Sequence, residues 1–161
     1  MSLPLLITKE KLYAELRSAA DLPTFPFRRF SFGPDDLKSH SEEFIEILLI
    51  DQKDVQTVGQ LWWHGLQEFL SSLPDDVFST SVYHLDCLLL LNPPEDQLTY
   101  LMDHLKTVCK RTDAGEALRR FTQEEHLVSG ILLQDNVDEI ESFTLLQFEE
   151  TYLLIWWYST A

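Results

Sequence analysis

The C-terminal stretch HLVSGILLQDNVDEIESFTLLQFEETYLLIWWY (residues 126–158) decides the fold class. Three apolar runs alternate there with short polar, acidic breaks. The runs predict strands over His126–Gln134, Glu139–Phe148 and Thr151–Tyr158, because apolar stretches bounded by turn residues are typical of strands. Asp135-Asn136 and Glu149-Glu150 predict the turns. Strands joined by short turns usually pair with each other, so this region is predicted to form an antiparallel meander.

Upstream of the meander, segments with helical spacing of apolar residues are interspersed with segments in which apolar and polar residues alternate. Thr8 is placed to cap a first helix, and Asp51 or Asp54 to cap a second. The apolar second half of Ser79–Leu91 predicts a central strand covered on both faces. A helix starting at Asp35 is the alternative to a strand at residues 44–50. The expected elements are helices over Thr8–Ala20 and Val55–Leu70 and after Asn92-Pro93, and strands at Phe30–Phe32, Phe44–Ile50 and Ser79–Leu91.

This order predicts an α+β fold, a single-domain sandwich of helices on a largely antiparallel sheet with a C-terminal three-stranded meander. No linker or internal repeat divides the chain, so residues 1–161 are expected to form one acidic domain.

Charge is the second informative feature. The chain has 27 acidic and 12 basic side chains, a net charge of -15, and no lysine or arginine after Arg120. Because 45% of the residues are hydrophobic, the acidity belongs to a packed globule and not to a disordered tail. A nucleic-acid backbone needs a basic footprint, for which only Arg28/Arg29 and Lys106–Arg120 qualify. Direct nucleic-acid binding is therefore not expected, whereas a basic protein partner is.

Targeting signals and cysteine usage indicate the compartment. No apolar run approaches the roughly 18 residues of a membrane span. Cys87 and Cys109 lack CxxC spacing and are interpreted as reduced, buried thiols. The sequence therefore predicts a cytoplasmic protein without membrane association, and it leaves the oligomeric state open.

Candidate chemistry is confined to one segment. On a strand, His84 and Asp86 share a face, as a general base or a pair of metal ligands would require. Cys87 points to the other face, and no further ligand follows at metal-site spacing. There is no GxSxG elbow and no glycine-rich phosphate loop. The sequence predicts no catalytic, cofactor or metal site, and a hydrolase or metal enzyme around His84/Asp86 is the third alternative for function.

Two adjacent tryptophan pairs bear on recognition. Neighbours in a helix lie about 100° apart, and neighbours in a strand face opposite sides. Each pair is therefore expected to place one ring less deeply than the other. Trp62 falls among the apolar residues that recur every three or four positions on one face of the predicted helix, and Trp63 does not. Trp156 and Trp157 point to opposite faces of the predicted strand. Partly exposed aromatics beside carboxylates are typical of binding hot spots; the alternative is that helices cover both faces.

In size, acidity and mixed topology the chain is similar to toxin-neutralising immunity proteins and to acidic secretion chaperones, with no motif shared residue by residue. The hypothesis is a non-enzymatic protein-binding domain, in its sharper form an immunity or inhibitor protein that neutralises a basic, nuclease-like toxin. The alternative is a homodimeric chaperone or assembly subunit that binds through an apolar groove or a sheet edge. The expected contact residues are Trp63, Glu124, Glu125, Asp138, Glu139, Glu141, Glu149, Glu150 and Trp157.

Overall fold

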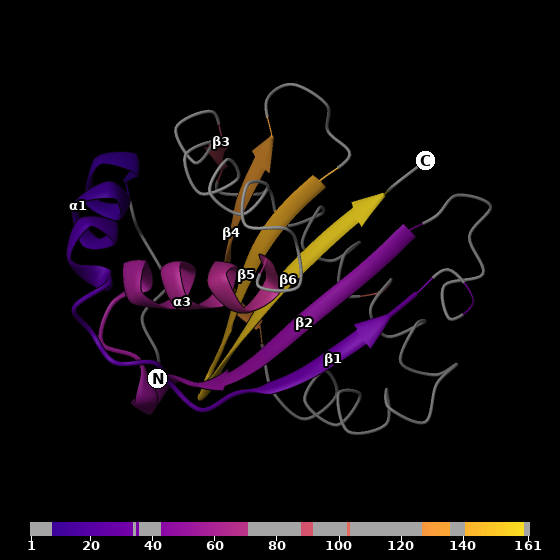
Figure 1. Cartoon of the computed structure of the whole chain (residues 1–161), viewed down its shortest axis with the longest axis horizontal. Coiled ribbons are helices and arrows are strands. Elements are labelled where there is room, and N and C mark those ends of the chain that lie inside the picture. Colours follow the sequence, from indigo (N-terminus) through magenta and orange to yellow (C-terminus); the bar gives the residue numbers. More distant parts are fainter. Residues whose placement is uncertain are drawn as a thin grey trace.

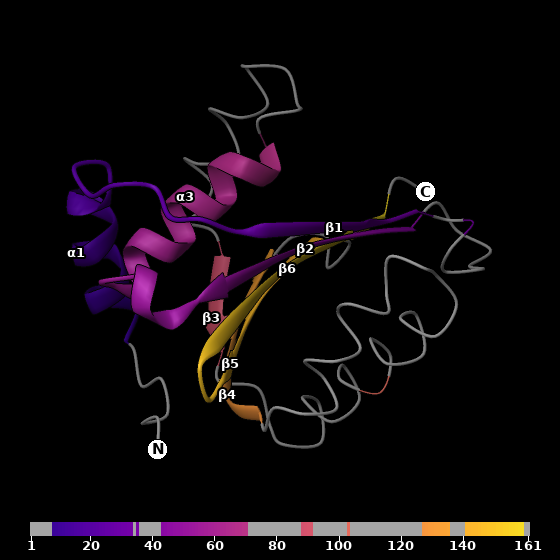
Figure 2. The same ribbon diagram turned by 90° about the horizontal axis from the view of Figure 1, so that it is seen from below.

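The computed structural model describes residues 8–33, 35, 43–70, 88–91, 103, 127–135 and 141–159. Within these residues a twisted antiparallel sheet carries two α-helices on one of its faces (Figures 1 and 2). The predicted α+β class is confirmed.

The sheet has six strands in the order β1-β2-β6-β5-β4-β3, and every neighbouring pair is antiparallel. The three C-terminal strands pair in sequence order, so the predicted meander is confirmed. β2 inserts beside β6 and thereby joins the N-terminal strands to the meander. The strands are β1 (Arg28–Phe32), β2 (Glu43–Asp51), β3 (Leu88–Leu91), β4 (Leu127–Asp135), β5 (Glu141–Phe148) and β6 (Thr151–Ser159).

β3 corrects one prediction. The apolar run ending at Leu91 was expected to form a central strand, but among the described strands β3 has β4 as its one neighbour and lies at the end of the sheet. Apolar composition reports whether the faces of a strand suit an interior. It carries no information on how many neighbours the backbone has. The rest of the predicted Ser79–Leu91 strand, and the helix predicted after Asn92-Pro93, lie outside the described residues.

α1 (Lys9–Ala19) follows the sequence prediction closely. Thr8 is its N-cap, in an extended conformation, and its Oγ1 accepts a hydrogen bond from the Lys11 amide at 3.2 Å. This satisfies one of the amides that the first helical turn leaves without an intrahelical acceptor. The helix ends one residue before the prediction, with Ala20 as its C-cap.

The second helix, α3 (Val58–Leu70), begins three residues later than predicted and has a different cap. The 3-10 helix η1 (Gln52–Asp54) occupies the position where the cap was expected. Thr57 is the observed cap, because its Oγ1 accepts from the Gln60 amide at 3.0 Å. In return, Oε1 of Gln60 accepts from the Gln56 amide at 2.7 Å. Thr57 and Gln60 thus form a variant of the capping box.

The alternation of each strand divides the core between the two faces of the sheet. On the face that carries the helices, Leu48, Leu154 and Trp156 pack with Trp62 and Phe69 of α3; we call this the helix-side cluster. The opposite pleat carries a second buried group, the far-side cluster: Phe30, Phe32, Ile45, Ile47, Leu49, Leu146, Phe148, Leu153 and Ile155. Burial on both faces explains why β2 and β6 are apolar almost throughout.

An ion-pair network fastens the first strand to α3. The Arg29 guanidinium donates to a Glu46 carboxylate oxygen at 3.1 Å and to the Glu68 carboxylate at 3.3 Å. It also donates to the main-chain carbonyl of Glu68 at 3.3 Å, near the C-terminus of the helix. A cation there complements the helix dipole. The network therefore holds one end of α3 against β1 and β2.

Candidate protein-binding surface

The turn between β5 and β6 presents two adjacent carboxylates. Phe148 and Thr151 flank the turn and are buried, whereas Glu149 and Glu150 between them are exposed. Asp51 is also exposed and pairs with Thr151 on the neighbouring strand. Three acidic residues thus lie at the same end of adjacent strands. We call Asp51, Glu149 and Glu150 the acidic turn.

A single residue, Gln52, fixes the backbone of this turn through its side chain and its main-chain amide. The Gln52 amide nitrogen Nε2 donates to the carbonyls of Phe148 at 2.5 Å and Thr151 at 3.2 Å. The Gln52 main-chain amide donates to the carbonyl of Glu150 at 3.0 Å. Three hydrogen bonds from one residue hold both ends of the turn. The two carboxylate side chains therefore project from a backbone whose conformation is fixed.

Two charged residues and one aromatic residue lie next to the acidic turn. Lys53, in η1, is exposed and is the local cation, while Asp54 is partly buried. Tyr152 follows the turn on β6 and pairs with Gln147. Burial raises the pKa of the Tyr152 phenol above its ordinary value of 10.0. The rim of the turn is therefore acidic, and a partly buried phenol lies just behind it.

The two tryptophan pairs divide as predicted. Trp62 is fully buried and Trp156 is 5% exposed, while Trp63 and Trp157 are partly exposed. Trp156 stacks against Phe143 with ring centroids 5.9 Å apart and an interplanar angle of 11°. Within the described residues, Trp62 Nε1 is a buried donor with no acceptor. One ring of each pair is therefore structural, and the other reaches the surface.

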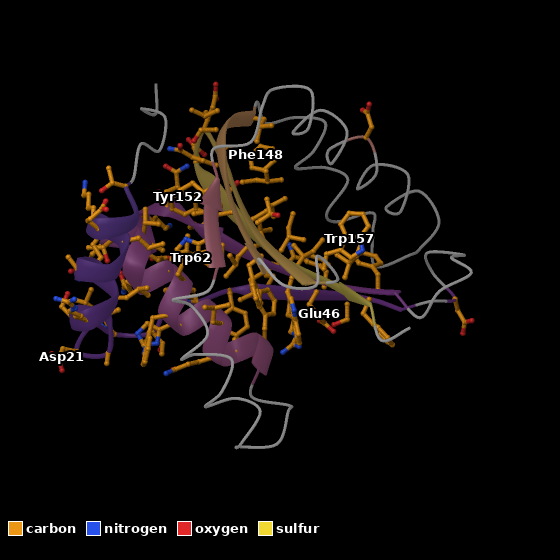
Figure 3. All side chains as sticks on the ribbon, turned by 90° about the horizontal axis from the view of Figure 1, so that it is seen from above. Asp21, Glu46, Trp62, Phe148, Tyr152 and Trp157 are labelled. Atoms are coloured by element: carbon orange, nitrogen blue, oxygen red, sulfur yellow. The ribbon has the colours of Figure 1, made fainter. Side chains whose placement is uncertain are left out.

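These two surface rings do not lie together. Trp63 belongs to α3, on the helix side of the sheet, whereas Trp157 packs beside the far-side cluster. Trp157 is also at the opposite end of β6 from Glu149 and Glu150. Figure 3 shows Phe148 and Tyr152 near one end of the sheet and Trp157 toward the other. Glu141 pairs with Tyr158, so it belongs to the same end as Trp157.

The predicted contact set is therefore spread over at least two places. Glu149 and Glu150 form the acidic turn, together with Asp51, which the sequence analysis had considered only as a helix cap. Register would have revealed Asp51 as their neighbour, because the strand that ends there pairs with the start of β6. Four of the predicted contacts lie outside the described residues: Glu124, Glu125, Asp138 and Glu139.

The histidine and acidic residues of the described part of the chain were compared with the arrangement that a metal site requires. No group of three or more His, Cys, Asp or Glu side chains there is arranged to hold a metal ion. His64 bonds through Nε2 to the carbonyl of Leu22 at 3.0 Å and meets Phe25 edge-on, which is a packing role. His84 and Asp86 lie outside the described residues.

Of the basic residues considered for nucleic-acid contact, Arg29 is engaged by the Glu46 and Glu68 carboxylates. Arg28 is exposed and lies over the Phe30 ring, 5.5 Å from its centroid. Lys106–Arg120 lies outside the described residues. In the described part of the chain neither helix has the length and apolarity to cross a membrane. Comparisons with protein-family models, curated proteins and solved structures found no match.

Proposed function

We propose that this chain is a non-enzymatic protein-binding domain that recognises a basic protein through the acidic turn. One observation carries the proposal. In a chain with a net charge of -15, Glu149, Glu150 and Asp51 are exposed together on a turn that Gln52 holds at both ends. Exposed like charges repel one another, so their concentration favours a cationic partner.

The physical advantage of this arrangement lies in speed and preorganisation. A negative patch steers a positively charged protein and raises its association rate, more than it raises the final affinity. A turn that is already ordered loses little conformational entropy on binding. The Gln52 hydrogen bonds supply that order before a partner arrives.

In its narrower form, the proposal is an immunity or inhibitor protein that occupies the cationic substrate cleft of a nuclease-like toxin. The carboxylates of the acidic turn would stand where substrate phosphates bind, and basic side chains of the cleft would pair with them. Trp157 lies at the other end of β6, so an aromatic anchor beside the turn has to come from another residue, of which Tyr152 is the nearest described.

The test compares two variants of equal charge. Glu149→Lys/Glu150→Lys and Asp21→Lys/Asp35→Lys each change the net charge from -15 to -11. All four residues are exposed, but only the first pair belongs to the acidic turn. Each protein is immobilised and exposed to a lysate of its source cell. The association rate of the basic protein that wild type retains is then measured at about 0.01 and 0.15 M salt, where the screening length falls from roughly 30 to 8 Å.

The expected result is that the turn variant loses the partner while the control keeps it, and that association slows at least tenfold over the salt range. Polylysine serves as a probe of net charge alone, and both variants should lose affinity for it equally. Equal loss of the protein partner in both variants, or association that does not change with salt, would contradict the proposal.

A second candidate function has its own observation. β1 lies at one end of the described sheet, and Phe27 next to it is 39% exposed. Among the side chains that the structure describes, Phe27 is the one exposed large hydrophobic. An edge strand beside an apolar residue suits addition of a strand from a client or a second copy. A mass that rises with concentration and does not change with salt would favour this homodimeric chaperone or assembly subunit.

A further inference from the structure

The N-terminal helix α1 lies at the periphery of the molecule. Figures 1 and 2 both show it beyond α3, on the side away from the sheet. Among the described elements its main contact is with α3. Five of its eleven residues are charged. Among its described side chains Leu12 and Ala19 are buried, and Leu12 belongs to the helix-side cluster, against which Leu16 packs. This described buried set is smaller than that of α3, so apolar burial contributes less to holding α1 in place.

A polar contact at Gly59 joins the two helices. A carboxylate oxygen of Glu15 accepts from the Gly59 amide at 2.8 Å, so α1 supplies an acceptor to the first turn of α3. The backbones are close here. A Cβ at residue 59 would overlap Cβ of Glu15 and lie 2.6 Å from its carbonyl carbon and 2.9 Å from the Leu16 amide nitrogen. Two of these three atoms are backbone, so no side-chain rotation relieves the overlap.

The segment after α1 is attached separately. The Gln60 side-chain amide donates to the carbonyl of Pro23 at 2.8 Å, and His64 bonds to the carbonyl of Leu22. Phe25 is 4% exposed and belongs to the helix-side cluster. We call Leu22, Pro23 and Phe25 the anchor segment. Its two hydrogen bonds to α3 involve no residue of α1, although Leu12 of α1 and Phe25 both belong to the helix-side cluster.

From this division we infer that α1 is a separately opening unit. It can leave α3 while the anchor segment and the sheet stay folded, which uncovers the first turn of α3. On opening, the Gly59 amide and the Glu15 carboxylate exchange their mutual bond for bonds to water, so the net loss is much smaller than the energy of the bond itself. The inference is independent of the proposed function, since it involves no residue of the acidic turn.

Amide hydrogen exchange on the intact protein, followed residue by residue by NMR, tests this directly. Elements that open locally exchange with a smaller free energy than those that need global unfolding. The α1 amides are expected to exchange at least about tenfold faster than those at the centres of β2 and β6, relative to unstructured peptide rates. Equal protection of α1 and the sheet would overturn the inference.

Two variants with a matched control sharpen the test. Gly59→Ala should undock α1. The exchange rates of the α1 amides should then rise to within about tenfold of peptide rates, while the centres of β2 and β6 keep most of their protection. Gly33→Ala is the control, because a Cβ there meets nothing within 4 Å. It should leave both regions as in wild type. If Gly59→Ala reduces α1 and the sheet to one common level of protection, or leaves α1 protected, α1 is not a separate unit.

Glu15 provides a milder variant in case the glycine substitution prevents folding. Glu15→Ala should speed exchange of the α1 amides and of the Gly59 amide several-fold. Glu15→Gln keeps an oxygen acceptor for Gly59 and should recover part of that protection. Identical exchange in Glu15→Ala and wild type would show that the bond does not hold α1, which overturns the inference as well.

Discussion

α1 and α3 lie on the same face of one sheet but are held by different forces. α3 carries one acidic and no basic residue, buries Trp62 and Phe69 and contacts β1 through Arg29. α1 is rich in charge, and its main described contact is with α3. A layer of helices can therefore combine one element that supplies many core side chains with another that, among its described side chains, supplies few. The two helices look alike in a ribbon drawing. They differ in how many of their described side chains are buried.

The strongest test of this contrast compares one buried residue from each helix. Trp62→Ala should lower the free energy of unfolding by about 3–5 kcal/mol, because a fully buried ring leaves a large cavity. Leu12→Ala should cost less than the roughly 2–5 kcal/mol usual for a buried leucine, since α1 can open instead of retaining a cavity. Urea unfolding followed by circular dichroism measures both. A Leu12→Ala loss equal to that of Trp62→Ala would make the two helices one cooperative unit.

The ion pairs of Arg29 should contribute less than the buried ring. Arg29→Ala removes contacts to Glu46 and Glu68 and should cost about 1–2 kcal/mol, a modest value because the arginine side chain is 28% exposed. Arg29→Lys keeps the charge but lacks the planar fork, so it should recover only part of the loss. Arg28→Ala, at the exposed neighbour, is the control and should stay within about 0.5 kcal/mol of wild type. An equal effect at both positions in urea unfolding would show that the network to α3 contributes nothing specific.

The two helix caps allow the same substitution in both helices. Thr57→Ala and Thr8→Ala each remove a side-chain acceptor and should cost about 1 kcal/mol in wild type. In a Gly59→Ala background the Thr8→Ala cost should vanish, because α1 is already undocked there, while the Thr57→Ala cost persists. A double-mutant cycle measures the difference. A Thr8→Ala cost that persists unchanged would place α1 in the cooperative core.

The smallest effect concerns Tyr152, which lies on β6 just after the acidic turn. The pKa of Tyr152 is raised by burial, so the folded state favours the neutral phenol. Below pH 10 both states hold the proton and stability does not change. Above pH 10 the unfolded state releases it first, so stability falls as pH rises toward the folded pKa. Tyr152→Phe should reduce this alkaline fall, measured as the free energy of unfolding at pH 8 and pH 11. An identical fall in the variant would assign it to other groups.

Local patterns predicted the local structure well. The acidic pair Glu149-Glu150 marked a turn between two apolar runs, and both strands pair as expected. Thr8 was recognised as a cap from its place before an amphipathic run, and the hydrogen bond to Lys11 is present. The start of α3 was misplaced because Asp51 and Asp54 are good capping residues on their own. The reciprocal signal, Thr57 followed by Gln60 three residues later, was present in the sequence and specifies the true start.

Long-range arrangement was harder to predict. Nothing local places β2 between β1 and β6, or β3 at the end of the described sheet, because strand order depends on pairings between distant segments. The acidic turn was predicted for its two glutamates, but neither Asp51 beside them nor the Gln52 hydrogen bonds followed from spacing. Trp63 and Trp157 were both expected as contacts, and spacing could not show that α3 and the odd-numbered residues of β6 lie on opposite sides of the sheet.

Because the four indoles are buried to different degrees, they can serve as intrinsic fluorescence probes. Trp62 and Trp156 lie in an apolar interior, and the Trp62 indole nitrogen finds no acceptor within the described residues, so these rings should emit at short wavelength and resist a water-borne quencher such as acrylamide. Trp63 and Trp157 reach solvent and should emit at longer wavelength and be quenched first. Because Trp63 belongs to the helix layer and Trp157 to the far side of the sheet, single replacements by phenylalanine would assign a spectral change to one side of the molecule without any added label.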